Sequence, residues 1–365
     1  MRTGVKMLVA GGGTGGHLFP GVAIAEELLS RAPGNAVSFA GTERGLEARL
    51  IPQKGYALDL IRVRPLRGQG FGGFIRGLFA LPISLIESVR ILRARRPDIV
   101  IGVGGYASGP MVIAAWLMRI HRVIMEQNTI PGTTSRLLGR FAEAVFIAFE
   151  ISARYFPRGS THLLGNPVRR TLLDNYIHSR VPTSAFTLLV FGGSQGAHVL
   201  NTSVADAVEL MGPERDGMAL IHQTGKADLD EIKARYRALG YDAFVTEFID
   251  DMSTAYKRAD LVICRAGATS VAEMGVCKKP SILVPFPFAT DDHQTKNAEA
   301  MAAAGAAVVI RQENLGAESL LATIRSLRDS PEKLRAMEQA AGTFGRPEAA
   351  REVVDLCIEI VEGKA

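Results

Sequence analysis

The chain has 365 residues, of which 47% are hydrophobic and 22% charged, which excludes a disordered or fibrous protein. At roughly 150 residues per domain, this length predicts at least two domains. Its three cysteines, Cys264, Cys277 and Cys357, include no CxxC pair, so the sequence offers neither a disulfide framework nor a zinc ribbon. A glycine run follows Ala10 and ends the first apolar stretch too early for an export signal, so we expect a reducing cytoplasmic location.

Apolar, strand-like runs alternate with helical stretches along the chain. A strand at 7–10 is followed by a helix at 21–31 and a strand at 36–40, and this order predicts a parallel sheet. The uncharged run 99–118 has the length of a membrane span. Its glycines and Pro110 instead favour a buried strand, a glycine loop and a helix. Two C-terminal helices are expected at 334–341 and 348–361, the second with an apolar stripe.

The two halves of the chain open alike. The strand at 7–10 leads into Gly-Gly-Thr-Gly-Gly at 12–16, and the strand at 188–191 leads into Gly-Gly-Ser-Gln-Gly at 192–196. Later in each half, the strands that begin at Asp98 and Asp260 also lead into glycine-containing loops. We therefore predict two similar domains, with a boundary between 164 and 183, where Asn166-Pro167 breaks regular structure.

A glycine turn between a strand and a helix lets backbone amides approach an anion, and the helix N-terminus adds partial positive charge. The first loop also fits GxGxxG, but the second strand ends in Gly41-Thr42 rather than in the acid of a dinucleotide site, so NAD binding is disfavoured. His17 follows this loop, where the helix N-terminus favours a neutral imidazole that can accept a proton. Alternatively, His17 hydrogen-bonds the loop and has no catalytic role.

Polar residues of the second half also carry candidate chemistry. Glu273 stands early in a predicted helix at 268–276, where it can bind sugar hydroxyls or merely favour the helix dipole. The cluster 291–294 with Asn297 follows an apolar strand at 282–288, at the strand end where ligands bind in α/β proteins.

Two further candidates concern a leaving phosphate. Asp228-Leu-Asp230 has the spacing of a metal-binding pair, but its charged surroundings favour a solvated helix start, so no metal ion is expected. Without a metal ion the phosphate needs cations, and Arg169 is a candidate, with an ordinary surface arginine as the alternative.

Arginine is concentrated between positions 62 and 96, where eight arginines accompany one acid, Glu87. The same segment contains a run of large apolar residues, a pairing that suits the surface of an anionic membrane. A buried helix with solvated ends is the alternative, whereas nucleic acid is disfavoured because lysine is absent and apolar bulk is excessive. The candidate membrane residues are Phe71, Phe74, Ile75, Leu78 and Phe79.

Six motifs between Met7 and about Ala307 together resemble the MurG family of glycosyltransferases. They are Gly12-Gly-Thr-Gly-Gly-His17, Gly104-Gly-Tyr-Ala-Ser-Gly-Pro110, Glu126-Gln-Asn128, Asn166-Pro-Val-Arg169, Gly192-Gly-Ser-Gln-Gly196 and Ala266-Gly-Ala-Thr-Ser-Val-Ala-Glu273. The resemblance implies an α/β GT-B glycosyltransferase fold, two Rossmann-like domains separated by a cleft. Residues 1–165 would form the acceptor and membrane-associating domain and 166–345 the UDP-GlcNAc-binding domain, with a C-terminal helix at about 346–365 packing back onto the first.

The resemblance also implies the reaction. An inverting, metal-independent and cofactor-free transfer would move N-acetylglucosamine from UDP-GlcNAc to the C4 hydroxyl of MurNAc in lipid I, giving lipid II for peptidoglycan synthesis. Because lipid I, undecaprenyl-diphosphate-MurNAc-pentapeptide, lies in a membrane, the protein would be peripheral on the cytoplasmic face of the cell membrane. Its partners would include that anionic surface and proteins of cell-wall synthesis and cell division.

The resemblance assigns roles to residues at matching positions. His17 is the candidate base. The acceptor pocket would contain Gly13, His17, Gly104, Gly105 and Tyr106. The donor contacts would be Thr14, Gly15, Gly16, Asn128, Arg169, Ser194, Ile249, Ala268, Thr269, Ser270, Val271, Ala272, Glu273 and Gln294. Two positions depart from many members, Met125 in place of histidine and Ala272 in place of serine, and Met125 cannot transfer a proton.

Three other functions remain in competition. A GT-B enzyme that glycosylates diacylglycerol would share the donor and the membrane surface, but the motifs at 12–17 and 104–110 argue against it. A UDP-GlcNAc 2-epimerase would share the architecture and convert the donor alone. A membrane-binding module without activity would leave the glycine motifs without a role.

Overall fold

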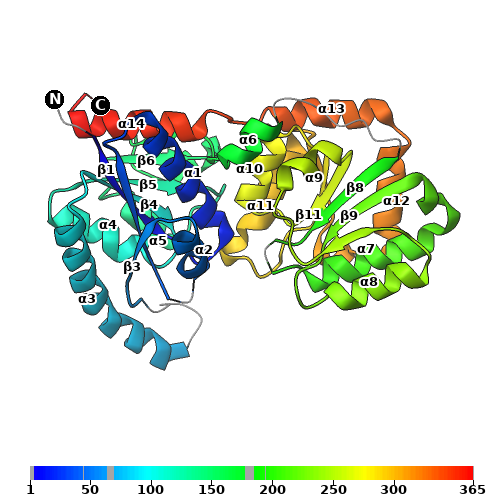
Figure 1. The fold of residues 1–365 in the computed structure, drawn as a ribbon, viewed down its shortest axis with the longest axis horizontal. Helices are drawn as coiled ribbons and strands as arrows, with labels where there is room; N and C mark the ends of the chain where they lie inside the picture. The colour runs from blue at the N-terminus through cyan, green and yellow to red at the C-terminus, as the bar shows by residue number, and fades with distance from the viewer. Residues whose placement is uncertain (1–3, 44, 64–69, 177–184, 194, 365) are drawn as a thin grey trace. The chain divides into compact units, whose positions relative to one another are not determined.

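The computed structural model describes residues 4–43, 45–63, 70–176, 185–193 and 195–364, with side chains for all of these except residues 70–80 and Thr290. The chain forms two compact units. Unit 1 comprises residues 1–170 and 347–365, and unit 2 comprises residues 171–346. Each unit is built on its own parallel sheet (Figure 1).

The sheet of unit 1 has seven parallel strands in the order β3-β2-β1-β4-β5-β6-β7. The chain starts in the middle of the sheet, proceeds to one edge and returns to build the other, which is the doubly wound arrangement of nucleotide-binding folds. The strands are β1 (Lys6–Gly11), β2 (Ala36–Gly41), β3 (Ala57–Leu60), β4 (Ile99–Gly104), β5 (His121–Glu126), β6 (Ala144–Ile147) and β7 (Thr161–Leu163).

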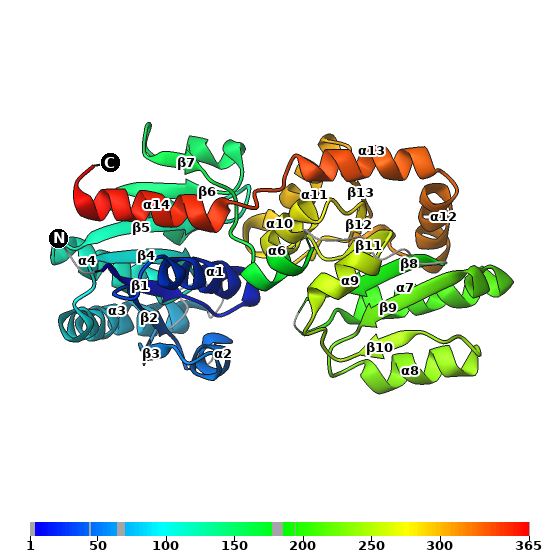
Figure 2. The ribbon, with the colours of Figure 1, turned by 45° about the horizontal axis from the view of Figure 1, so that its top comes forward.

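Helices cover both faces of this sheet because its central strands are apolar on both sides. Met7 and Val9 of β1 pack with α1 and the C-terminal α14 on one face, and Leu8 and Ala10 pack with α3 and α4 on the other. Figure 2 shows α14 beside α1. The helices are α1 (Gly15–Arg31), α2 (Glu47–Gln53), α3 (Gly70–Arg95), α4 (Ser108–Leu117), α5 (Thr133–Leu138), the 3-10 helix η1 (Glu150–Tyr155) and α14 (Ala349–Glu362).

Unit 2 repeats the same winding with six parallel strands in the order β10-β9-β8-β11-β12-β13. The strands are β8 (Phe186–Phe191), β9 (Met218–Gln223), β10 (Phe244–Thr246), β11 (Leu261–Cys264), β12 (Ser281–Leu283) and β13 (Ala307–Val309). The helical elements are α6 (Arg170–Tyr176), α7 (His198–Met211), η2 (Gly212–Gly217), α8 (Leu229–Ala238), α9 (Met252–Arg258), α10 (Ala268–Val276), η3 (Thr290–Asp292), α11 (His293–Ala303), η4 (Gln312–Asn314), α12 (Ala317–Arg328) and α13 (Pro331–Gly342).

The structure confirms the predicted alternation of strands and helices. The run 99–118 is β4, a glycine loop and α4, and the stripe on α14 is buried at Val353, Val354, Cys357 and Ile360. In the described part of the chain, no helix has both the length and the apolar character needed to cross a membrane.

Two predicted boundaries were wrong. The first helix begins at Gly15 rather than at residue 21, because the glycines of the loop already form its first turn. The strand predicted at 282–288 is β12, which ends at Leu283. Pro285 and Pro287 follow, and because proline has no backbone N–H, these residues cannot extend the strand ladder.

Candidate functional site

The glycine loops of both units lie at the point where the strand order reverses. In unit 1 they follow β1 and β4, which are neighbours, and in unit 2 they follow β8 and β11, which are also neighbours. Ligands of doubly wound folds bind outside the carboxyl ends of the strands at this point. The predicted correspondence of the two halves is therefore confirmed at the level of topology.

In unit 1 the two glycine loops touch backbone to backbone. The amide N–H of Gly12 donates to the carbonyl oxygen of Gly104 at 3.3 Å. Gly105 has φ +79°, and a Cβ there would overlap the carbonyl oxygen of Gly12. Glycine is required at this position both for its backbone conformation and for the space available.

A buried serine joins the same two strands. The hydroxyl of Ser108 donates to the carbonyl oxygen of Ala10 at 2.6 Å and accepts from the amide of Gly104 at 2.9 Å. Gln127 is also buried, and its side-chain amide donates to the carbonyl oxygen of Val103 at 2.8 Å. The bonds of Ser108 fix the second loop against the end of β1, and that of Gln127 ties the segment after β5 to β4.

His17 and Tyr106, both predicted to serve the acceptor, lie at these loops. The ring of His17 packs so closely on Gly104 that a Cβ there would overlap it. Its Nδ1 lies 3.5 Å from the hydroxyl of Thr14, and Tyr106 is 56% exposed. The structure thus brings His17 and Gly104 together, as expected of residues predicted to share the acceptor pocket, and places Thr14 beside them.

The sequence analysis missed Glu47, whose carboxylate lies beneath the first loop. One oxygen accepts from the amide of Gly13 at 2.6 Å. The other accepts from the amide of Thr42 at 2.9 Å and from its hydroxyl at 3.0 Å. The side chain is buried at 1% exposure, so Glu47 ties the first glycine loop to the loop after β2. A single acid with no motif around it carries little signal in a lone sequence.

The Glu126-Gln-Asn segment ends β5. Glu126 is 3% exposed, and burial raises the pKa of its carboxyl group. It accepts from the backbone amide of Asn128 at 3.0 Å and from its side-chain amide at 3.1 Å. Met125 is buried in the core. Glu126 therefore orients Asn128, the residue of this motif predicted to contact the donor.

The Asn166-Pro-Val-Arg segment lies at the end of unit 1. The guanidinium of Arg169 stacks over the ring of Phe19 in α1, 4.8 Å from the ring centroid, which is a cation–π geometry. Asn166 is 4% exposed, and among the described residues both polar atoms of its side chain lack a hydrogen-bond partner. A buried amide of this kind normally has a partner.

In unit 2 the loop 192–196 packs on the turn after β9. A Cβ at Gly196 would overlap the carbonyl oxygen of Thr224, and a Cβ at Gly225 would overlap that of Gln195. The predicted donor residue Ser194 lies outside the described residues. In unit 2, as in unit 1, glycines allow two backbone segments to pack closely together.

Gln223, at the end of β9, is a second residue that the sequence analysis missed. Its side-chain N–H donates to the carbonyl oxygen of Gly193 at 2.9 Å, and its side-chain oxygen accepts from the amide of Ile249 at 3.1 Å. A single buried side chain therefore holds the glycine loop and the 248–252 loop together. The amide of Ile249 is consequently already engaged.

Glu273 lies on α10, whose bounds match the predicted helix. It is 5% exposed and accepts from the hydroxyl of the buried Tyr256 at 3.2 Å. Burial, together with the nearby Glu273, raises the pKa of Tyr256, so this phenol stays a hydrogen-bond donor. Its bond fixes the position of the carboxylate.

The loop after β12 leads into α11. Gln294 accepts from the amide of Phe286 at 3.0 Å, and the buried Asn297 donates to the carbonyl oxygen of Ala266 at 3.2 Å. The guanidinium of Arg265 donates to the carbonyl oxygens of Val284 and Pro285, both at 3.1 Å. The sequence shows no sign of a role for Arg265. In the structure its hydrogen bonds hold the loop that contains Phe286.

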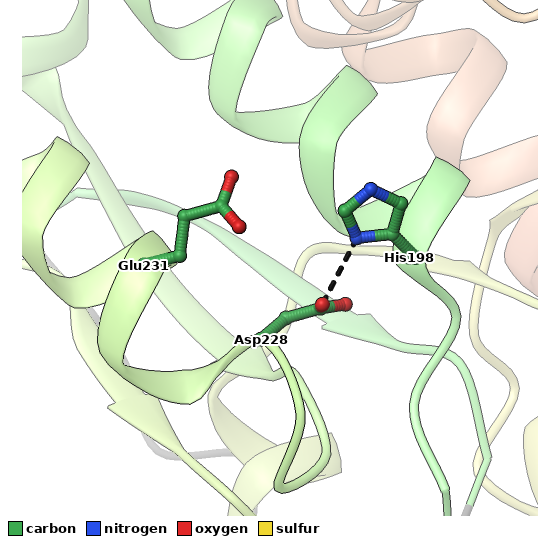
Figure 3. Close-up of side chains that lie close together, drawn as sticks. All are labelled: His198, Asp228 and Glu231. Carbon is green, nitrogen blue, oxygen red and sulfur yellow. Dashed lines mark hydrogen bonds and ion pairs between the residues drawn. The ribbon is translucent and has the colours of Figure 1, made fainter.

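The Asp228-x-Asp230 pair corrects one interpretation. Asp230 is exposed, as expected of a solvated helix start, but Asp228 is 7% exposed. Asp228 accepts from the side-chain amide of Asn201 at 2.7 Å and lies 2.9 Å from Nδ1 of His198 (Figure 3). The solvated-helix interpretation was therefore wrong for Asp228, because a buried asparagine holds it in the interior.

Two family models match the chain. The glycosyltransferase family 28 N-terminal domain matches residues 7–147, and the glycosyltransferase family 28 C-terminal domain matches residues 187–353. A protein of Myxococcus xanthus named UDP-N-acetylglucosamine–N-acetylmuramyl-(pentapeptide) pyrophosphoryl-undecaprenol N-acetylglucosamine transferase is 54% identical. The alignment covers 98% of this chain and 93% of the relative.

Two solved structures are similar to this chain. The crystal structure of Acinetobacter baumannii MurG has a TM-score of 0.78 and 31% identity, with 97% of this chain and 99% of that chain covered. A putative UDP-N-acetylglucosamine 2-epimerase from Listeria monocytogenes has a TM-score of 0.69 at 13% identity, covering 100% and 98%. This second likeness shows a shared fold alone.

Replacing Gly105 by alanine should destabilise unit 1 more than replacing Gly13. Both glycines have positive φ, +79° and +88°, so backbone strain of about 1–2 kcal/mol is common to both. A Cβ at Gly13 meets nothing within 4 Å, whereas one at Gly105 overlaps the backbone of Gly12, which should cost roughly 1–3 kcal/mol more. Urea unfolding followed by fluorescence of Trp116, the single tryptophan, measures the difference. Equal loss in both variants would contradict the proposed contact.

Proposed function

Because this chain belongs to glycosyltransferase family 28, we propose that it transfers N-acetylglucosamine from UDP-N-acetylglucosamine to the lipid-linked N-acetylmuramyl-pentapeptide, lipid I, giving lipid II. The observation that carries the proposal is near-full-length identity of 54% to a relative named for this transfer. The epimerase alternative rests on likeness at 13% identity, which is too low to support an activity.

The proposed reaction is an inverting displacement. The C4 hydroxyl of the acceptor attacks the anomeric carbon of the donor sugar, the new O4–C1 bond forms, and the bond from C1 to the phosphate oxygen breaks as UDP leaves. The hydroxyl proton passes to a base. We assign that role to His17, which the structure holds by close packing on Gly104 and places beside the hydroxyl of Thr14.

We assign the acceptor diphosphate to the paired glycine loops of unit 1, with Gly13, Gly104, Gly105 and Tyr106 lining it. The amide of Gly13 donates to Glu47 and is not available to the diphosphate. The diphosphate would therefore bind at the N-terminus of α1, whose first turn begins at Gly15. Helix N-termini bind anions through their amides and dipole.

We assign the uridine part of the donor to unit 2. The diphosphate would meet the loop 192–196, including Ser194, and the ribose hydroxyls would bind the carboxylate of Glu273. The amide of Ile249 already donates to Gln223. The carbonyl oxygen of Ile249 would therefore accept the hydrogen bond from the N–H of uracil. Residues 268–272 and Gln294 would complete the contacts of this unit. Thr14, Gly15, Gly16, Asn128 and Arg169 would supply those of unit 1.

The test of the reaction is transfer of radiolabel from UDP-N-acetylglucosamine into the lipid phase with a lipid I analogue. We expect His17→Ala to lower kcat by about 100-fold or more, the usual contribution of a general base, and to leave the affinity for UDP within a few-fold. Conversion of the donor without an acceptor would instead indicate an epimerase. Unchanged kcat in His17→Ala would remove His17 as the base without affecting the proposed transfer.

The donor assignment predicts that Glu273→Gln weakens binding of UDP. A hydrogen bond to a charged group contributes roughly 1.5–3 kcal/mol, so the loss of one such bond should raise Kd at least about 10-fold. Isothermal titration calorimetry measures it, with the exposed Glu318→Gln on α12 as the matched control. Native affinity in Glu273→Gln would contradict the ribose role.

We also propose that α3 docks on an anionic membrane, so that the protein is peripheral on the cytoplasmic face, near proteins of cell-wall synthesis and cell division. The candidates Phe71, Phe74, Ile75, Leu78 and Phe79 belong to α3, although their side chains lie outside the described ones. Further along α3, Ile83 and Ile86 are 49% and 54% exposed. Exposed apolar side chains beside arginines are typical of interfacial helices.

The pair of replacements Ile83→Glu and Ile86→Glu should reduce binding to vesicles that contain anionic lipid. The reason is that carboxylates oppose both apolar insertion and the surface potential. Leu210→Glu on α7 is the control, because Leu210 is similarly exposed at 51% in unit 2. Sedimentation with vesicles measures the bound fraction, and an equal loss in both proteins would contradict a specific role for α3.

A further inference from the structure

We propose that His198, Asp228 and Glu231 form a binding site for a divalent transition-metal ion such as Zn²⁺. Each residue offers one ligand atom, and these atoms all lie within 4.8 Å of one another. His198 is the first residue of α7, and Asp228 and Glu231 stand at the start of α8. A bound ion would therefore join the first turns of two helices of unit 2.

The three ligand atoms must move closer together for a metal ion to bind, because they now lie within 4.8 Å of one another. With metal–ligand bonds of about 2.0–2.2 Å, neighbouring donors of a tetrahedral site lie about 3.3 Å apart. Nδ1 of His198 and Oδ1 of Asp228 share a hydrogen bond at 2.9 Å, and a metal ion would take the place of the proton between them. Figure 3 shows the carboxylate of Glu231 turned toward the same space. His198 and Glu231 are exposed, so their side chains can move the remaining distance.

Asp228 carries the independent sign that this cluster is more than a helix start. It is the N-cap residue of α8, a position where aspartate normally accepts from the backbone amides of the first turn. Its side chain makes no such bond. The carboxylate instead turns toward His198, and its second oxygen accepts from Asn201 at 2.7 Å. One oxygen is thus fixed and the other is presented to the cluster.

The fixing residue is itself buried in a chain of hydrogen bonds. The side-chain amide of Asn201 also donates to the carbonyl oxygen of Thr224 at 2.8 Å. Its side-chain oxygen lies 3.2 Å from Nε2 of His222, and Nδ1 of His222 lies 2.9 Å from the hydroxyl of Tyr236. Asn201 and His222 are both fully buried. In metal sites, buried residues that hydrogen-bond to a ligand side chain hold that ligand in the orientation needed to bind the metal ion.

The donor set suits a transition metal. An imidazole with two carboxylates binds Zn²⁺ and similar ions, and the two carboxylates balance the charge of a divalent cation. A contrasting pair occurs at His121 and Glu143, whose atoms lie 2.8 Å apart. There the carboxylate of Glu143 also forms an ion pair with the guanidinium of Arg122 at 2.8 Å. The positive charge of Arg122 would repel a metal cation at that pair. The third group near His198 and Asp228 is instead the carboxylate of Glu231, which would attract a cation.

The test is calorimetric titration of the full-length, chelator-treated protein with Zn²⁺ at pH 7.5. We expect one site, with Kd raised at least about 10-fold in His198→Ala and in Glu231→Gln. Asp230→Asn is the matched control, because Asp230 neighbours Glu231 on α8 and is exposed without belonging to the cluster. Its Kd should stay within about twofold of the native value.

These variants change exposed side chains, so loss of the fold is not expected, and circular dichroism checks it. Equal affinity in the native protein and Glu231→Gln would overturn the site, as would the absence of measurable Zn²⁺ binding. A loss in Asp230→Asn equal to that in Glu231→Gln would also overturn it, since general negative charge would then suffice. Because the readout is metal binding, the outcome is independent of the proposed transfer reaction.

Discussion

Close approach of two backbone segments at the centre of each sheet is the constraint on which the rest of the structure depends. In unit 1 the loop after β1 lies on the loop after β4, and in unit 2 the loop after β8 lies on the turn after β9. Any side chain at Gly105 or Gly196 would overlap a carbonyl oxygen. In unit 1 the N-terminus of α1 follows directly on the crowded loop, at the strand ends where ligands of doubly wound sheets bind. Glycine thus serves packing and recognition at once.

Loops built from glycine lack side chains of their own to hold them, and each unit supplies a buried polar side chain from elsewhere. Glu47 fastens the first loop of unit 1 to the loop after β2, and Gln223 fastens the loop of unit 2 to that at Ile249. Both bridge segments distant in the chain, so each offsets the flexibility that glycine brings. The proposed ligand contacts therefore depend on residues that touch no ligand.

The sequence predicted the fold well because its signals are local. Alternating apolar runs, glycine turns and the repeated pair of strand-and-loop motifs are each contained in a short window, and they placed β1, β4, β8 and β11 correctly. The roles of Glu47, Gln223 and Arg265 were missed because each depends on a partner brought near by folding. Asp228 was misjudged for the same reason, since its charged neighbours in sequence indicate solvent whereas Asn201 in space buries it.

The two units share one winding of the sheet but hold their glycine loops with different side chains, and this difference bears on the ligand proposed for each. Beneath the loop of unit 1 lies the carboxylate of Glu47, whereas the loop of unit 2 is held by the neutral amide of Gln223. Because the side chain of Glu47 accepts from the amide of Gly13, that amide is not available to a diphosphate. This difference favours the proposed assignment, in which unit 2 binds the diphosphate that leaves with UDP. Under the same proposal, unit 1 positions the acceptor diphosphate and releases it with the product.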